Sequence, residues 1–282
     1  MFFVLKSFAY FISYLPNGVL VGGAHLLTFI AYDLLGIRKK ILLKNLDIAY
    51  GSSLDTKQKK QIARQSFLHF FFTVFELLKS IRVPLSSQLK IIGKDYAEES
   101  AAAEKGVFIL LFHMGNWEVL GGAFSAMRAN SPGVVKPVGS PAVNKLVQYI
   151  REKNGMQSLY RDNNIEILRE IIRQIKRGSF VGFPMDQFRP GDIEVDFFGK
   201  KTATNSGLAI LARKFGCEVL VSYCIRRSFF NFELYIQPPL ELQKTATSKD
   251  DIAANTLLFN QEMEKVIVKH PEQYMWLHNR WK

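Results

Sequence analysis

A histidine and a carboxylate, His113 and Glu118, stand five positions apart directly after the apolar run 106–112. The run predicts a buried strand, and Gly115 allows a sharp turn into a helix that Asn116 can cap. Enzymes with α/β folds carry their chemistry at such carboxyl ends of strands. We therefore predict that His113 is a general base and that Glu118 reaches back to orient its imidazole. The structural alternative is a histidine that only packs against or caps the end of the strand.

No protein nucleophile accompanies this pair. The sequence contains no Gly-x-Ser-x-Gly elbow, and its two cysteines, Cys217 and Cys224, lie seven positions apart beside one apolar run. Residues seven apart on a strand face opposite sides, so we expect no disulfide between them. The sequence also has no cluster of His and Cys at zinc-binding spacing. A base without a nucleophile favours direct attack by a substrate hydroxyl over a covalent acyl-enzyme.

From about residue 90, apolar runs alternate with segments of helical spacing. Strands are predicted over 106–112, 133–137, 179–184, 193–198, 218–225 and 232–237, and helices over 118–129, 141–153, 163–176, 205–215 and 251–269. This alternation predicts an α/β fold with a layered, mostly parallel sheet flanked by helices. If the sheet is parallel, Asp186, which follows the run 179–184, lies at the same edge as His113.

The N-terminal segment has no charged side chain over residues 7–32. It is long enough to cross a bilayer as one helix, but Pro16, Asn17 and Gly18 interrupt it. Three arrangements stay open. They are one tilted spanning helix over roughly 17–35, two short helices that lie in the membrane interface, and a buried hairpin of core helices.

Basic residues crowd the segment that follows. Residues 38–64 include eight Lys or Arg and two Asp, in a chain whose net charge is +12. A basic stretch beside an apolar one is typical of a membrane-facing segment on the cytoplasmic side, and nucleic acid ranks last as a partner because no nucleic-acid-binding motif is present.

A cap signal at 52–55 precedes a helix with one broad apolar face. We expect a membrane anchor over 1–36, a basic amphipathic helical region over 37–85, and an α/β domain over 86–282.

The His-x4-Glu spacing resembles the signature of the glycerolipid acyltransferases. The wider pattern resembles one branch of them, the bacterial lipid A biosynthesis acyltransferases, which add the late, secondary acyl chains. The likeness extends over nearly the whole chain. The matching stretches are 106–118, 185–187, 195–199 with Thr202 and Thr204, 209–216 and 271–280.

This resemblance implies a glycerolipid acyltransferase-like fold with an N-terminal membrane-anchoring helical segment. It implies an enzyme of the bacterial inner membrane, with its catalytic domain on the cytoplasmic face. Its reaction would transfer a fatty acyl chain from acyl carrier protein, or from coenzyme A, to a hydroxyl of a lipid A precursor in lipopolysaccharide biosynthesis. The acyl donor is a co-substrate, and neither a cofactor nor a metal is implied.

The family's motifs also assign residues. His113 and Glu118 fall on the catalytic pair, and Arg151 and Asp186 fall on functional positions that we assign to substrate binding. Several relatives have a histidine after the aspartate where this chain has Gln187, so only Asp186 is carried over.

Two residues complete the expected substrate-binding set. Asn116 stands within the turn between the strand and the helix, and Arg226 ends a strand. The guanidinium of Arg226 can meet an anionic headgroup there, or it can be solvated.

Two further functions remain as alternatives. One is an acyltransferase with another acceptor, such as a mannosylated phospholipid or a lysophospholipid. The other is a membrane lipid-binding protein without catalytic activity, in which His113 and Glu118 would be dispensable.

Overall fold

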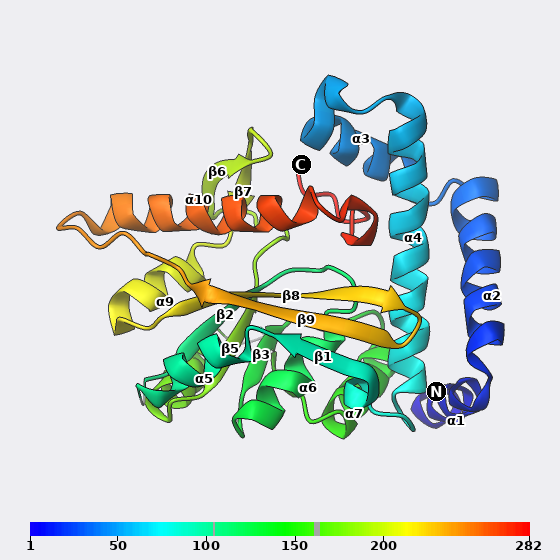
Figure 1. The fold of residues 1–282 in the computed structure, drawn as a ribbon, viewed down its shortest axis with the longest axis horizontal. Coiled ribbons are helices and arrows are strands. Elements are labelled where there is room, and N and C mark those ends of the chain that lie inside the picture. The colour runs from blue at the N-terminus through cyan, green and yellow to red at the C-terminus, as the bar shows by residue number, and fades with distance from the viewer. Residues whose placement is uncertain (104, 161–163) are drawn as a thin grey trace.

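A seven-stranded sheet forms the centre of the protein (Figure 1). In this computed structural model, which describes residues 1–103, 105–160 and 164–282, the strand order is β1-β9-β8-β2-β5-β3-β4. All neighbours run parallel except β8 and β9. The predicted α/β fold with a mostly parallel sheet is therefore confirmed. The strands of this sheet are β1 (Leu89–Ile92), β2 (Val107–Leu111), β3 (Pro132–Val135), β4 (Gln157–Tyr160), β5 (Phe180–Pro184), β8 (Val219–Ser228) and β9 (Asn231–Pro239).

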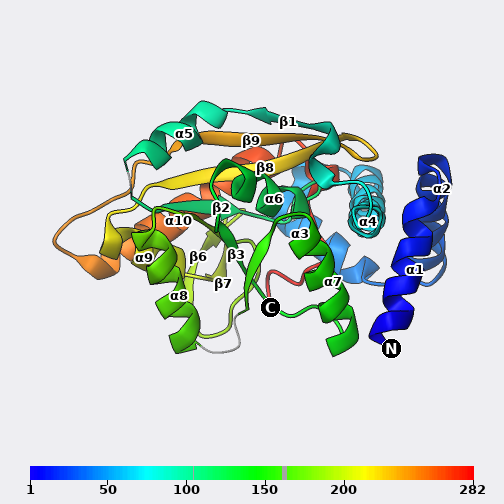
Figure 2. The same ribbon diagram turned by 90° about the horizontal axis from the view of Figure 1, so that it is seen from below.

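Helices cover both faces of the sheet (Figures 1 and 2). Phe108 and Leu110 of β2 pack in one core cluster with α8, α9 and α10, whereas Val107 and Ile109 pack in another with α5 and α6. A strand buried on both faces has a continuous apolar sequence, which is why the run before His113 predicted it. The helices of this part are α5 (Lys94–Ala102), α6 (Glu118–Met127), α7 (Pro141–Lys153), α8 (Asn164–Lys176), α9 (Gly207–Phe215) and α10 (Ser248–Ile267).

Every predicted strand and helix has a counterpart, with ends that differ by a few residues. The helix predicted over 163–176 is described from Asn164, so its first position lies outside the described residues. The predicted strand 193–198 pairs with a strand that was not predicted. Together they form a separate antiparallel hairpin of β6 (Ile193–Phe197) and β7 (Lys200–Thr204). Cys217 and Cys224 are both buried and free, as their spacing predicted.

The N-terminal segment forms two helices that meet at Pro16. Within residues 1–103, 105–160 and 164–282, no single helix has both the length and the apolar character needed to cross a bilayer. Helix α1 and the segment from α2 to η1 reach that standard only as a pair bent by 118°. Both helices pack on α4 (Figure 1). Many of their large apolar side chains remain exposed, including Phe3, Phe8 and Phe11. The elements are α1 (Phe2–Tyr14), α2 (Asn17–Thr28), the π-helical η1 (Phe29–Leu34), α3 (Lys39–Tyr50) and α4 (Thr56–Lys79), with short 3₁₀ turns at η2 (Gly51–Ser53), η3 (Leu85–Gln88) and η4 (Pro271–Gln273).

Helix α4 starts at the predicted cap. The Asp55 carboxylate accepts a hydrogen bond from the Gln58 N–H, and the Gln58 side-chain oxygen accepts one from the Asp55 N–H, each 2.8 Å long. This reciprocal pair satisfies two backbone donors that the first turn would otherwise leave unpaired. Helix α4 then lies across the end of the sheet at which β8 terminates (Figure 1). It buries Phe67, Thr73 and Glu76 against the rest of the protein.

Candidate active site

The turn that carries His113 begins where β2 ends. Strands β2 and β5 are parallel neighbours with Leu111 opposite Pro184, so the residues two positions further along each chain meet at one edge. There His113 Nδ1 lies 2.8 Å from Asp186 Oδ1, and the His113 backbone N–H donates to Asp186 Oδ2 at 3.1 Å. The prediction that the two residues share an edge is confirmed.

Glu118 has a different partner from the one predicted. Its carboxylate accepts two hydrogen bonds from Arg151, Nε to Oε2 and Nη2 to Oε1, each 2.7 Å long. Glu118 lies in the first turn of α6 and Arg151 in the last turn of α7, so the packing of these two helices sets the pair. In the part of the chain that the structure describes, Asp186 is the hydrogen-bonding partner of the His113 imidazole. The expected hydrogen bond from Glu118 to the imidazole is therefore wrong.

These pairings shift the pKa values of all four groups. Burial alone would lower the pKa of His113, but the charge and hydrogen bond of Asp186 outweigh it and raise that pKa above 6.5. Burial would raise the pKa of Asp186 and of Glu118, but His113 lowers the first and Arg151 lowers the second. Burial likewise opposes the charge of Arg151, whereas Glu118 raises its pKa. Both carboxyl groups are therefore held ionised.

The hydrogen bond to Asp186 also selects the tautomer of His113. An ionised carboxylate can only accept, so Nδ1 carries the proton and Nε2 keeps its lone pair. The Trp117 ring packs edge-on against the imidazole at 4.9 Å between centroids and restricts its rotation. The ring is therefore oriented as a base at Nε2.

A cavity of about 860 Å³ adjoins His113. Near the imidazole its wall includes the polar residues Glu118, Arg151 and His278, and most of the other lining residues are apolar. Pro184, Gly182 and Phe180 line it in turn from the carboxyl end of β5 to its start, a distance of roughly 13 Å at about 3.3 Å per residue. Apolar side chains from α4, α6 and α7 form much of the remaining wall, among them Val74, Leu77, Leu120, Phe124, Leu146 and Ile150. This shape suits an extended apolar chain whose reacting end lies at His113.

Arg151 lines the cavity, but the two groups through which it could grip a phosphate are occupied. Its Nε and Nη2 both bind Glu118. The remaining nitrogen, Nη1, is buried and has no hydrogen-bond partner among the residues that the structure describes. Arg151 is thus held by Glu118 and does not offer a free two-pronged clamp to a phosphate in the cavity.

Arg226 and Asn116, which were predicted to bind substrate, lie outside the cavity wall. Arg226 is buried, and each of its guanidinium nitrogens has a partner on α4: Nε and Nη2 bind Glu76, and Nη1 bonds His69 Nδ1 at 2.7 Å. Burial lowers the pKa of His69 to about 3, with a further contribution from Arg226, so His69 is neutral and accepts this bond. Asn116 is fully buried and bonds Glu76. Both side chains are bonded within the fold rather than placed at this cavity, and their role in substrate binding stays a prediction.

Sequence reasoning gave no role to His278, which lines the cavity near His113. Its Nε2 lies 3.1 Å from the Phe188 backbone nitrogen, which can only donate, so the proton of the ring is on Nδ1. Burial lowers the pKa of His278 to about 4, which keeps the ring neutral. His278 lies in the stretch 271–280 that resembles the family, and this could have marked it as a site residue. Its spacing from other residues gave it no partner.

The same C-terminal stretch forms backbone hydrogen bonds with the turn around His113. The Gly115 N–H donates to the Gln273 carbonyl and the Met275 N–H donates to the His113 carbonyl, each at 3.0 Å. Met114 and Tyr274 form an antiparallel bridge between these bonds. The segment far along the chain therefore fixes the backbone on which the base is carried.

We expect the pKa of His113 to depend on Asp186. In Asp186→Asn the negative charge that raises this pKa is lost while burial still lowers it, so the pKa should fall below its wild-type value. The measurement is an NMR titration of the ring protons in both proteins. An unchanged His113 pKa in the variant would contradict the pairing.

Gly115→Ala should be more destabilising than a left-handed backbone alone explains. Gly115 has φ +58°, and a Cβ there would lie 2.1 Å from the Cys224 carbonyl oxygen on β8. Gly191, with φ +76° and no atom within 4 Å of such a Cβ, is the matched control. Denaturant unfolding should show a loss of about 1–2 kcal/mol for Gly191→Ala and at least about 2 kcal/mol more for Gly115→Ala. Equal losses would mean that the close approach to β8 is unimportant.

Comparison with known proteins identifies the family. The model of the bacterial lipid A biosynthesis acyltransferases matches residues 2–282. The lipid A biosynthesis palmitoleoyltransferase of Escherichia coli (strain K12) is 27% identical over 252 residues, which cover 87% of this chain and 79% of that protein. The lipid A biosynthesis lauroyltransferase of the same strain is 26% identical over 253 residues, with the same coverage of 87% and 79%.

A second group of relatives is named for a different lipid. The phosphatidylinositol mannoside acyltransferase of Mycobacterium tuberculosis (strain ATCC 25618 / H37Rv) is 27% identical over 231 residues, which cover 77% of this chain and 68% of that protein. Both groups are acyltransferases, and the family match extends over the strand, the turn and the C-terminal stretch that build the site around His113. The chain therefore belongs to the bacterial lipid A biosynthesis acyltransferase family and is an acyltransferase.

Proposed function

We propose that this acyltransferase moves a fatty acyl chain from a thioester donor, acyl carrier protein or coenzyme A, to a hydroxyl group of a lipid A precursor. The observation that carries the proposal is the His113–Asp186 pair beside an apolar cavity. A base oriented by a buried carboxylate can activate a hydroxyl, and the apolar walls can hold the acyl chain next to it. The family relationship supports the acceptor class.

The reaction needs one proton to be moved twice. Nε2 of His113 accepts the proton of the acceptor hydroxyl as its oxygen bonds to the thioester carbon, and the electron pair of the carbonyl bond moves onto oxygen. When that pair returns, the carbon–sulfur bond breaks and the leaving thiolate takes the proton from the imidazolium. Asp186 stabilises the imidazolium between the two steps, because its charge favours the protonated ring. Transfer should therefore increase as the pH rises through the elevated pKa of His113.

Arg151 is assigned to stabilise the negative charge that develops on the carbonyl oxygen, and Glu118 is assigned to hold Arg151 in place. Arg151 lines the cavity beside the base, and its positive charge can stabilise an oxyanion there. Glu118 fixes the guanidinium through two hydrogen bonds and also favours the imidazolium through its charge. In this proposal Glu118 acts on the reaction through Arg151 and through space, not by a hydrogen bond to His113.

Charged residues around the cavity favour anionic substrates. Arg38 and Arg189 line it, and Arg189 pairs with Asp192 at 3.5 Å. Positive charge at the entrance of a cleft raises the local concentration of anions. An acidic carrier protein and a phosphorylated glycolipid both fit this charge.

The N-terminal helices are assigned to the membrane surface. Apolar side chains of α1, α2 and η1 are exposed, and the basic residues of α3 and α4 follow directly in sequence. An apolar face beside Lys and Arg is typical of helices that lie in the interface of an anionic membrane. We propose that the bent pair docks on the cytoplasmic face of the inner membrane, where a glycolipid acceptor can enter the site.

The proposed function is tested by His113→Ala. Removal of a general base costs about 10²–10⁴ in rate, so transfer from acyl carrier protein or coenzyme A to a purified lipid A precursor should nearly disappear. Thermal unfolding and membrane flotation should remain as in the wild type. Near wild-type turnover in this variant would refute the mechanism.

Mass spectrometry of lipids from a deletion strain tests the acceptor, because loss of a chain from a mannosylated phospholipid instead of lipid A would indicate the other acceptor class.

Gly182 should control the length of the acyl chain. It lies midway along the cavity wall on β5, and a Cβ there would lie 3.0 Å from Leu111 Cδ2, within the proposed path of the chain. Gly182→Ala and Gly182→Val should shift the preference to shorter donors, Val more than Ala, since each lost buried methylene is worth about 0.8 kcal/mol, or about fourfold in kcat/KM. The measurement is kcat/KM for a series of saturated acyl donors. A uniform loss for all chain lengths would contradict the assignment of this wall.

A further inference from the structure

A second ion pair is buried beside the site and takes no part in the mechanism. Arg226 of β8 and Glu76 of α4 bond through Nε to Oε1 at 2.7 Å and Nη2 to Oε2 at 2.6 Å, and their side chains are 2% and 0% exposed. The free energy lost when two charges leave water is about as large as the free energy gained from their attraction. Such a pair is therefore a weak source of stability. The two side chains also form hydrogen bonds to other parts of the protein.

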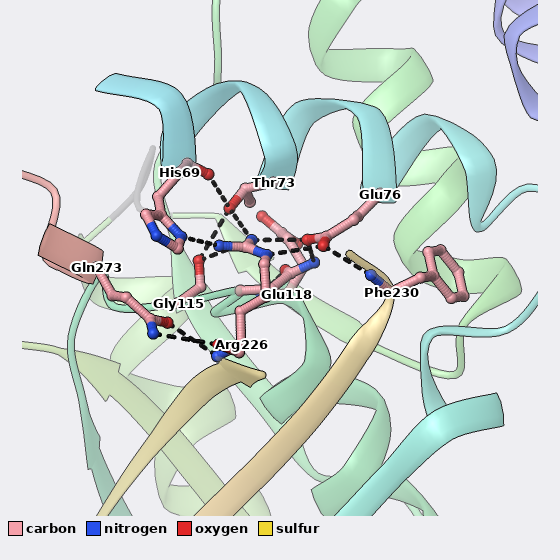
Figure 3. Close-up of polar contacts among 9 residues, drawn as sticks. His69, Thr73, Glu76, Gly115, Glu118, Arg226, Phe230 and Gln273 are labelled. Atoms are coloured by element: carbon pink, nitrogen blue, oxygen red, sulfur yellow. Dashed lines mark hydrogen bonds and ion pairs between the residues drawn. The ribbon is translucent and has the colours of Figure 1, made fainter. Parts of the chain in front are cut away.

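Both members of the pair bond the turn between His113 and Glu118 (Figure 3). Arg226 Nη2 donates to the Gly115 carbonyl at 3.1 Å, and Thr73 of α4 donates to the same carbonyl at 2.9 Å. Glu76 Oε2 accepts from Asn116 Nδ2 at 2.9 Å. The other end of the Asn116 amide, Oδ1, accepts from the Glu118 N–H at 3.1 Å. A continuous chain of bonds thus runs from Glu76 to the first turn of α6.

The opposite side of the turn is connected to Arg226 through Gln273. Gln273 exchanges two hydrogen bonds with the Arg226 backbone, from Arg226 N to Oε1 at 2.9 Å and from Nε2 to Arg226 O at 3.1 Å. The Gln273 carbonyl accepts from the Gly115 N–H. Strand β8, helix α4 and the C-terminal stretch therefore converge on Gly115 (Figure 3).

We infer that Glu76 and Arg226 are positioning residues for acyl transfer, a role that rests on the proposed function. Neither side chain lines the cavity, so neither can touch the substrate there. They act through Gly115 and Asn116, which lie between His113 on one side and Glu118 on the other. Release of this turn displaces the base and the Glu118–Arg151 pair together, and a misplacement of about 1 Å can cost about a hundredfold in rate.

The test compares two variants of this network with one of a matched ion pair elsewhere. Asn116→Ala cuts the link from Glu76 to Glu118 and leaves the ion pair, whereas Glu76→Gln keeps the shape of the side chain and removes its charge. Asp251→Asn is the control, because Asp251 is 1% exposed and bonds Arg213 at 2.7 Å between α9 and α10 without contacting the turn. Each variant is measured for kcat and KM, for the His113 pKa by NMR, and for thermal unfolding.

We expect kcat to fall about 10- to 100-fold in Asn116→Ala and Glu76→Gln with little change in KM. The His113 pKa should fall in both, since its hydrogen bond to Asp186 depends on the position of the turn. Asp251→Asn should lose stability but keep kcat and the His113 pKa. Losses of kcat that only follow the folded fraction, or an unchanged His113 pKa, would overturn the inference. If the wild type transfers no acyl chain to a lipid, the proposed function fails, and the NMR result alone still decides whether the pair positions the turn.

Discussion

The site depends on the pairing of buried charges at the carboxyl edge of the sheet. Asp186, Glu118 and Glu76 are all buried, and each is matched with a basic group: His113, Arg151 and Arg226, respectively. A buried charge without a partner costs several kcal/mol. If Glu118 turned to His113 instead, the buried Arg151 guanidinium would lose its charged partner. The observed set pairs each of the three carboxylates, and this fixes the roles that each residue can take.

Most of the sheet could be predicted from the sequence because its central strands are buried on both faces. Strand β2 has the unbroken apolar run that such burial requires, and β5 has the same pattern. Strands β1 and β4 lie at the two edges of the sheet and have no fully buried residue, so neither shows the apolar run of a central strand. Strand β7 begins with two lysines, because its first positions are exposed in a hairpin.

Chain position predicted that His113 and Asp186 share an edge, but it could not predict which acid contacts the imidazole. Spacing along the chain favoured Glu118, because it is near in sequence and begins a helix. Its real partner comes from α7, 33 residues away, and depends on how two helices pack. Arg226 shows the same limit. It ends a strand and could have been solvated, but Glu76, 150 residues away, covers it.

Helix α4 connects parts of the molecule that serve different purposes. Thr73, Val74 and Leu77 on this helix line the cavity, and Thr73 and Glu76 also bond the turn that carries the base. The N-terminal helices pack on the same element. Because protein interiors are close-packed, a shift of α4 cannot be absorbed locally. The orientation of the base, the shape of the cavity and the placement of the exposed apolar helices are therefore set by one helix, and a change in any of them affects the others.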